Sequence, residues 1–280
     1  MIDHLVPLTE ATPGDEVTVY VKGFLARGES AERFDHWSAG HRSMVETHDW
    51  SPFALGYHWE SGQLRKLALP IAGAAKVAWD VYRLVRNARR IAPLTAAGWF
   101  VAEQGAALCV RFVGQFIRAR RHATERADDL ASCFESLASR HQRVRVVAHS
   151  LGCLQVIEAT ARLPRGQRPH EIHLCAPACL EGEVREELPR LAREHSLVYF
   201  TRLDLVLESS FRVMAQGRAM GSAGLEGDYP GLRTLDVSEH FDFWVHTEYK
   251  NRFRRFAVRL EDPARHPAHE SGRESPRTEK

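Results

Sequence analysis

Short apolar runs rich in β-branched residues recur along the chain and alternate with longer amphipathic segments. The runs predict strands, which are residues 16–21, 53–59, 143–148, 171–176, 197–201 and 232–237. The amphipathic segments predict helices, which are residues 127–140, 153–162, 181–195 and a last helix that begins near residue 244. Strands that alternate with helices are typical of a parallel sheet covered on both faces. The sequence therefore predicts an α/β fold with a mostly parallel, doubly wound sheet.

One long helical stretch interrupts this alternation. Residues from about 61 to 128 are rich in Ala, with larger apolar residues every three or four positions, and Pro70 and Pro93 divide them into two or more helices. A minimal sheet of this kind needs one helix there, so we expect a helical insertion within a single domain of residues 1–261. Residues 262–280 are rich in Pro, His and charged residues and are predicted to form a disordered tail.

Charge is concentrated in the same stretch. Between Ser61 and Asp128 there are twelve Lys and Arg residues and four Asp and Glu residues, whereas the whole chain carries only +2. Such a small net charge does not by itself predict a nucleic-acid partner. Three interpretations of the basic insertion stay open: a cap that supplies an acyl-binding pocket, a surface that contacts a membrane peripherally, and a packed hairpin whose charges face solvent.

The cysteines and the N-terminus indicate a compartment. The five cysteines, at 109, 133, 153, 175 and 179, form no Cys-x-x-Cys motif, which favours reduced thiols in the cytoplasm. The first residues lack the basic and apolar regions of a signal peptide, and the longest uncharged run, Ile91–Ala102, is twelve residues and too short to span a bilayer. The His, Cys and acidic residues show no metal-ligand spacing, so we expect no metal and no cofactor.

The sequence Ala148-His149-Ser150-Leu151-Gly152 joins a predicted strand directly to a predicted helix. Small residues two positions either side of a serine allow the tight turn of a nucleophile elbow, which exposes the serine oxygen above the sheet. An ordinary turn in which Ser150 caps the helix is the alternative. A cap alone leaves the small residues on both sides unexplained, so Ser150 is the candidate nucleophile.

A serine nucleophile needs a general base and an acid that orients the base. Both must come from loops at the carboxyl ends of strands, where the elbow opens. Asp204 follows the strand at 197–201 and is the candidate acid, with Glu208 and Asp228 as alternatives. His246 is the candidate base, and His240 is the alternate.

Three further residues are expected to line the site. Leu151 follows the nucleophile, and its N–H is the first candidate donor to an oxyanion. Gly23 follows the first strand and lets the backbone approach, so the N–H of Phe24 is the second candidate, with Leu25 next. His149 is expected to pack or to line the substrate rather than to act as the base, because its side chain points away from that of Ser150.

From about Val17 to Phe256 the chain resembles the α/β-hydrolases of the lipase and esterase type, because Ser150, Asp204 and His246 follow the order of that family. It is also weakly similar to the transmembrane-and-coiled-coil-domain-type hydrolases, which carry a Gly-Phe loop after the first strand and a His-x-x-Tyr after the last. Here these are Gly23-Phe24 and His246-x-x-Tyr249. The resemblance implies an α/β-hydrolase-like fold and favours His246 over His240.

Three functions remain open at this point. The first is a serine hydrolase that cleaves carboxylic esters, with a lipid or acyl ester as substrate. The second uses the same three residues for acyl transfer or amide hydrolysis. The third is a hydrolase scaffold without catalysis, which binds a membrane or a protein through the basic insertion.

Overall fold

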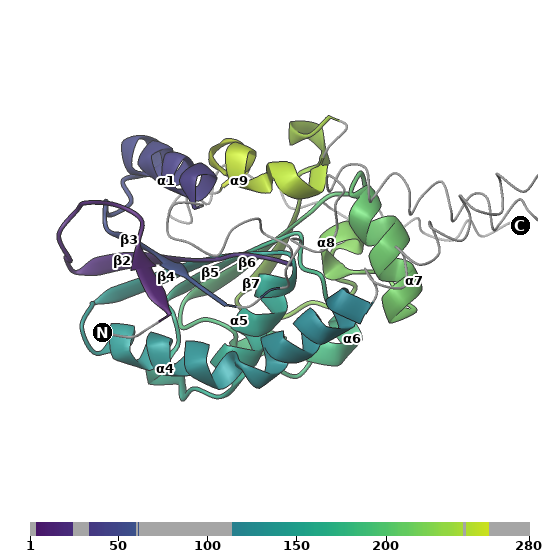
Figure 1. The fold of residues 1–280 in the computed structure, drawn as a ribbon, viewed down its shortest axis with the longest axis horizontal. Coiled ribbons are helices and arrows are strands. Elements are labelled where there is room, and N and C mark those ends of the chain that lie inside the picture. Colours follow the sequence, from purple (N-terminus) through teal and green to yellow (C-terminus); the bar gives the residue numbers. More distant parts are fainter. Residues whose placement is uncertain (1–3, 25–33, 60, 62–113, 243–244, 258–280) are drawn as a thin grey trace, which may run out of the picture.

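The computed structural model describes residues 4–24, 34–59, 61, 114–242 and 245–257. Seven strands form one sheet in the order β1-β3-β2-β4-β5-β6-β7 (Figure 1). They are β1 (Leu5–Pro7), β2 (Glu16–Val21), β3 (Ala54–Tyr57), β4 (Arg143–His149), β5 (Glu171–Cys175), β6 (His195–Phe200) and β7 (Leu232–Asp236). Only β1 runs antiparallel to its neighbour, and the other five pairs of neighbouring strands are parallel.

Helices cover both faces of this sheet (Figure 1). One face carries α1 (Asp35–His48) and α9 (Val245–Phe256), which contact each other. The other carries α4 (Ala127–Ala138), α5 (Leu151–Ala161) and the short α6 (Glu181–Val184). The short helices α7 (Arg212–Ala215) and α8 (Met220–Ala223) lie beside the carboxyl ends of the strands (Figure 1). This arrangement confirms the predicted α/β fold class, a mostly parallel, doubly wound sheet.

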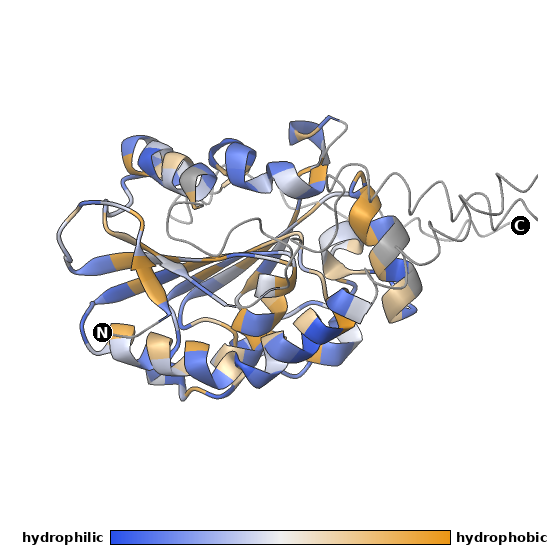
Figure 2. Cartoon of the chain, viewed as in Figure 1, coloured by the Kyte–Doolittle hydropathy of each residue, from blue (hydrophilic) through white to orange (hydrophobic). Residues whose placement is uncertain are grey.

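The central strand β4 contributes to a hydrophobic core on each side of the sheet. Successive side chains of a strand point to opposite faces. Val144 and Val146 therefore pack with residues of α4 and α5, whereas Val147 packs with residues of α1 and α9. In Figure 2 hydrophilic and hydrophobic residues alternate along α4, as expected for a helix with one face on a core.

A buried polar network lies on the α1 and α9 face, between β4, β5 and β6. Arg145 donates from Nε to Glu171 Oε2 at 2.8 Å, and its guanidinium stacks 4.1 Å from the ring centre of Trp50. His173 donates from Nε2 to Glu171 Oε1 at 2.8 Å, and Tyr199 donates from its hydroxyl to His173 Nδ1 at 2.8 Å. Each of the four side chains in this network therefore has a hydrogen-bond partner, which a buried polar network requires to be stable.

The structure corrects one predicted helix. Residues 181–195 do not form a continuous helix, because only α6 and a single 3₁₀ turn, η5 (Leu188–Arg190), occur there. Pro189 has no N–H to continue a helix. Beyond it, the N–H groups of Arg193 and Glu194 donate to the carbonyls of Pro169 and His170 instead.

Several elements were not predicted, and several predictions lie outside the described residues. The unpredicted elements include the three-residue strand β1, the helix α1, the π-helix Val206–Phe211 and the short helices α7 and α8. Of the insertion, residues 114–125 are helical and lead into α4, whereas residues 62–113 lie outside the described part, as do Leu25, Cys109 and the tail. No helix in the described part has both the length and the apolar character that a membrane span needs.

Candidate active site

Ser150 sits in a strained turn between β4 and α5. Its backbone has φ 54° and ψ −123°, in a region that residues with a Cβ rarely adopt. The turn is held by hydrogen bonds on both sides, because the N–H of Ser150 donates to Cys175 O at 2.9 Å and its carbonyl accepts from Ala178 N at 3.2 Å. The neighbouring strand therefore stabilises the turn, which is the local geometry predicted for a nucleophile elbow.

The loop after β2 packs directly against this turn through two glycines. A Cβ on Gly23 would lie 2.7 Å from the Cβ of Ser150 and 2.8 Å from the carbonyl oxygen of His149. A Cβ on Gly152 would lie 2.6 Å from the carbonyl oxygen of Lys22. Only hydrogen atoms fit at both positions, so glycine on each side lets the two backbones approach.

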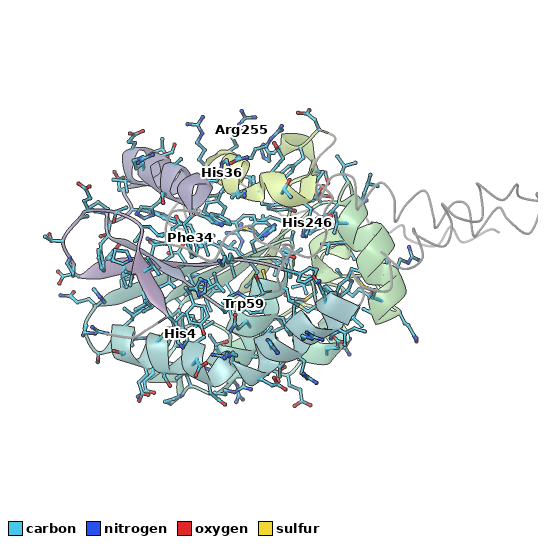
Figure 3. The ribbon with its side chains drawn as sticks, viewed as in Figure 1. His4, Phe34, His36, Trp59, His246 and Arg255 are labelled. Carbon is cyan, nitrogen blue, oxygen red and sulfur yellow. The ribbon has the colours of Figure 1, made fainter. Side chains whose placement is uncertain are left out.

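A chain of hydrogen bonds connects the three residues predicted as nucleophile, base and acid. Ser150 Oγ lies 3.0 Å from His246 Nε2, and His246 Nδ1 lies 2.7 Å from Asp204 Oδ2. In the neutral imidazole, Nδ1–H donates to the carboxylate and Nε2 accepts from the serine hydroxyl. His246 lies on the side of α9 that faces the sheet (Figure 3).

Backbone hydrogen bonds also hold the Asp204 carboxylate, in addition to its contact with His246. Its side chain is fully buried, and Oδ1 accepts from the backbone N–H groups of Val206 and Leu207, both at 3.1 Å. These amides lie in the first turn of a π-helix, Val206–Phe211, which follows β6. They satisfy one carboxylate oxygen and leave Oδ2 for the imidazole, which sets the orientation of His246.

The alternate candidates are not brought to Ser150. His240 lies in a 3₁₀ turn after β7, where its Nε2 is 3.5 Å from Glu239 Oε1 and its ring packs on Phe256. Glu208 forms ion pairs with Arg212 and Arg218, and Asp228 is exposed. Among the candidate bases and acids in the described part of the chain, only His246 lies in hydrogen-bond reach of Ser150, and only Asp204 in reach of His246.

His149 has a contact that the sequence did not predict. Its Nε2–H donates to the backbone carbonyl of His246 at 2.7 Å, and the two rings lie 5.0 Å apart. Burial, followed by the neighbouring His246, lowers the pKa of His149 well below its usual range. His149 is therefore neutral at pH 7, and it holds the first turn of α9 against the elbow without adding a charge.

The two candidate oxyanion donors directly follow Ser150 and Gly23 in the sequence. The N–H of Leu151 is at the first position of α5 and makes no hydrogen bond with the residues described here, as expected for the start of a helix. Phe24 directly follows Gly23, and its ring packs edge-on against Phe116 at 5.5 Å. Phe116 in turn packs against Phe211 of the π-helix at 5.9 Å. This aromatic trio joins the loop after β2 to the loop that carries Asp204.

The four cysteines in the described part of the chain are buried. Cys133, Cys153, Cys175 and Cys179 are free thiols with no exposed surface, and burial raises the pKa of each one. Thiols in this state are poor nucleophiles. Among the residues that the structure describes, no group of three or more His, Cys, Asp or Glu side chains is arranged to hold a metal ion.

Comparisons with known proteins found similarity in structure only. No protein-family model and no curated protein matches the sequence. An uncharacterised protein from Capnocytophaga ochracea matches with 9% identity and a TM-score of 0.40, over 89% of this chain and 58% of the other. This chain therefore spans less than two thirds of that protein.

Two structures named as hydrolases also match. The siderophore hydrolase EstB from Aspergillus nidulans matches with 13% identity and a TM-score of 0.36, over 89% of this chain and 83% of the other. The thermophilic esterase Est2 from Thermogutta terrifontis matches with 12% identity and a TM-score of 0.29, over 88% and 78%. Scores this low do not support an argument about function, which must come from the site.

Proposed function

We propose that this protein is a serine hydrolase that cleaves carboxylic esters through an acyl-enzyme intermediate. The observation that carries the proposal is the continuous hydrogen-bond chain from Ser150 Oγ through His246 to Asp204, with distances of 3.0 Å and 2.7 Å. This geometry is the one that a serine needs to lose its proton as it attacks a carbonyl carbon.

In the first half of the reaction, Ser150 Oγ forms a bond to the ester carbonyl carbon while its proton moves to His246 Nε2. The carbonyl oxygen becomes an oxyanion that accepts hydrogen bonds from the N–H groups of Leu151 and Phe24. The tetrahedral intermediate then expels the alcohol, which takes the proton from His246 Nε2. Asp204 stays ionised and stabilises the imidazolium through Nδ1–H.

In the second half, His246 Nε2 accepts a proton from water as the water oxygen attacks the acyl carbon. The new intermediate collapses, the carboxylic acid leaves, and the proton returns to Ser150 Oγ. The strained φ of Ser150 and the close approach of Gly23 support this proposal, because they bring the loop that carries Phe24 against the turn that carries the reacting oxygen.

Labelling with a fluorophosphonate tests the proposal. We expect the wild type to gain one adduct by intact mass, and Ser150→Ala to gain none while keeping the circular dichroism spectrum of the wild type. An unlabelled but folded wild type would overturn the proposal. Product analysis of a turned-over ester, with and without added alcohol or amine, separates hydrolysis from acyl transfer.

A further inference from the structure

A cavity of about 720 Å³ lies at the amino-terminal ends of the parallel strands, whereas Ser150 lies at their carboxyl-terminal ends. Its walls include Ser196 at the start of β6 and Gly231 just before β7. Ser150 follows the carboxyl end of β4, and β4, β5, β6 and β7 are parallel, so the cavity and Ser150 lie at opposite ends of these strands. The volume falls within the range of small-molecule sites.

Positive charge surrounds this cavity. Its lining includes four arginines and one acidic residue, which are Arg165, Arg168, Arg190, Arg193 and Glu194. The carboxylate of Glu194 is already engaged, because its Oε2 lies 3.0 Å from Arg143 Nη2. None of the four arginines forms an ion pair with any residue in the described part of the chain.

Backbone carbonyls hold the guanidinium of Arg168. Its Nε donates to Leu163 O at 2.9 Å, and its Nη1 donates to Arg190 O. Two backbone carbonyls therefore fix the guanidinium without neutralising it. Burial, followed by the positive charges of Arg190 and Arg165, lowers the pKa of Arg168. A bound anion would remove this repulsion.

The base of the cavity is apolar and its loops are restricted. Leu163, Leu188 and Leu191 contribute to the lining and are almost completely buried. Three prolines in the walls, Pro164, Pro189 and Pro230, limit the backbone conformations of these loops. The cavity thus combines an apolar base with a cationic rim, which fits a ligand with an apolar part and an anionic part.

We propose that this cavity binds a small organic phosphate that carries at least two negative charges. Arginine forks form paired hydrogen bonds with phosphate oxygens, and phosphate offers more acceptors than a carboxylate. A singly charged ligand would leave most of the positive charge of the four arginines uncompensated. The same phosphate chemistry occurs in soluble nucleotides and in phospholipid headgroups. Titration with ADP and sedimentation with phosphatidic-acid vesicles separate these two sources.

The test uses the full chain and calorimetric titration with ADP, inorganic pyrophosphate and sulfate at matched ionic strength. A parallel sedimentation assay uses phosphatidylcholine vesicles with and without phosphatidic acid. The test variant is Arg165→Gln/Arg190→Gln, in which both side chains are exposed and Arg168 keeps its bonds to backbone carbonyls. The control is Arg121→Gln/Arg140→Gln, which removes the same charge from exposed positions elsewhere.

We expect ADP and pyrophosphate to bind the wild type and the control variant more tightly than sulfate does. We expect the test variant to lose at least about tenfold in affinity, because two charge-assisted contacts are removed. Vesicle binding that needs both phosphatidic acid and the two arginines would identify a lipid headgroup as the source. Equal binding of all three anions, or equal affinity in the test and control variants, would overturn the proposal.

Discussion

The imidazole of His149 donates a hydrogen bond from Nε2 to the backbone carbonyl of His246, at 2.7 Å. His149 directly precedes the candidate nucleophile Ser150, and His246 is the candidate base. The hydrogen bond joins the end of β4 to the first turn of α9, which are far apart in the sequence. The position of the base therefore depends on a side chain that takes no part in proton transfer.

This contact predicts that His149 positions His246. In His149→Phe the carbonyl of His246 loses its donor, and we expect kcat for ester hydrolysis to fall roughly 10- to 100-fold, since small displacements of a reacting group have effects of that size. KM should stay close to the wild-type value. His149→Gln can still donate a hydrogen bond and should recover part of kcat. Steady-state kinetics of the two variants checks this, and an unchanged kcat in His149→Phe would contradict it.

The contact between Gly23 and Ser150 predicts that a single methyl group disrupts the site. In Gly23→Ala the new Cβ meets backbone and side-chain atoms below 3.0 Å, so the loop after β2 must move away from the elbow. We expect the free energy of unfolding to fall by about 1–3 kcal/mol, as for other overpacked positions. The same variant should lose most of its kcat.

Gly14→Ala is the matched control for this prediction, because a Cβ there would meet no atom within 4 Å. Urea unfolding and ester hydrolysis are measured on both variants. If Gly23→Ala behaved like Gly14→Ala in both assays, the close packing of the loop on the elbow would not matter for activity.

The hydrogen-bond chain predicts which histidine is the base. His246→Ala removes the group that contacts both Ser150 and Asp204, and we expect kcat to fall roughly 10²- to 10⁴-fold, the usual range for a general base. His240→Ala should keep activity near that of the wild type, because His240 contacts Glu239 and Phe256 instead. Rates of fluorophosphonate labelling measured on both variants decide between the two. The reverse order would assign the role to His240.

Stability should depend on pH through His41 of α1. Burial lowers the pKa of His41 to about 4, and its neutral ring donates from Nε2 to Ser51 O and lies 3.0 Å from the Tyr20 hydroxyl. Below an unfolded pKa of about 6.5 the unfolded chain binds this proton and the folded chain does not. The free energy of unfolding therefore falls as the pH drops from about 6.5 to 4, by on the order of 3 kcal/mol from this group.

Urea unfolding at a series of pH values measures this effect. His41→Gln should flatten the dependence in that window, whereas His36→Gln, an exposed histidine of the same helix, should leave it as in the wild type. An equal dependence in all three proteins would show that His41 does not contribute. Glu171 affects stability in a separate, more acidic pH range, because His173 and Arg145 lower its pKa. The stability that the ionised carboxylate contributes is lost only as that carboxylate is protonated.

The strands and the order of the candidate site residues could be predicted from local patterns. The segments with β-branched residues formed strands, and residues 16–21 matched β2 at both ends. The elbow is also a local feature, because its small residues lie within two positions of Ser150. The helix predicted at 181–195 was wrong because contacts with Pro169 and His170, distant from it in sequence, took the N–H groups that a helix would have used.

The unpredicted parts depend on tertiary contacts or on weak signals. The buried residues Trp37, His41 and Met44 of helix α1 recur every three or four positions, but the helix is polar overall, so its amphipathic signal is weak. Strand β1 has three residues and forms by pairing with β3. The bond from His149 to His246 has no local signal, because it requires α9 to pack over the end of β4.

The pair Arg145 and Glu171 has an evolutionary consequence. These residues lie directly opposite each other in the register of β4 and β5, and both are buried. Loss of Glu171 would leave the buried guanidinium of Arg145 with only Glu16, 3.9 Å away, as a charged partner, which is strongly destabilising, whereas replacement of both Arg145 and Glu171 by apolar residues is often tolerated. In related sequences the two positions should therefore change together, and a chain that keeps one without the other should be rare.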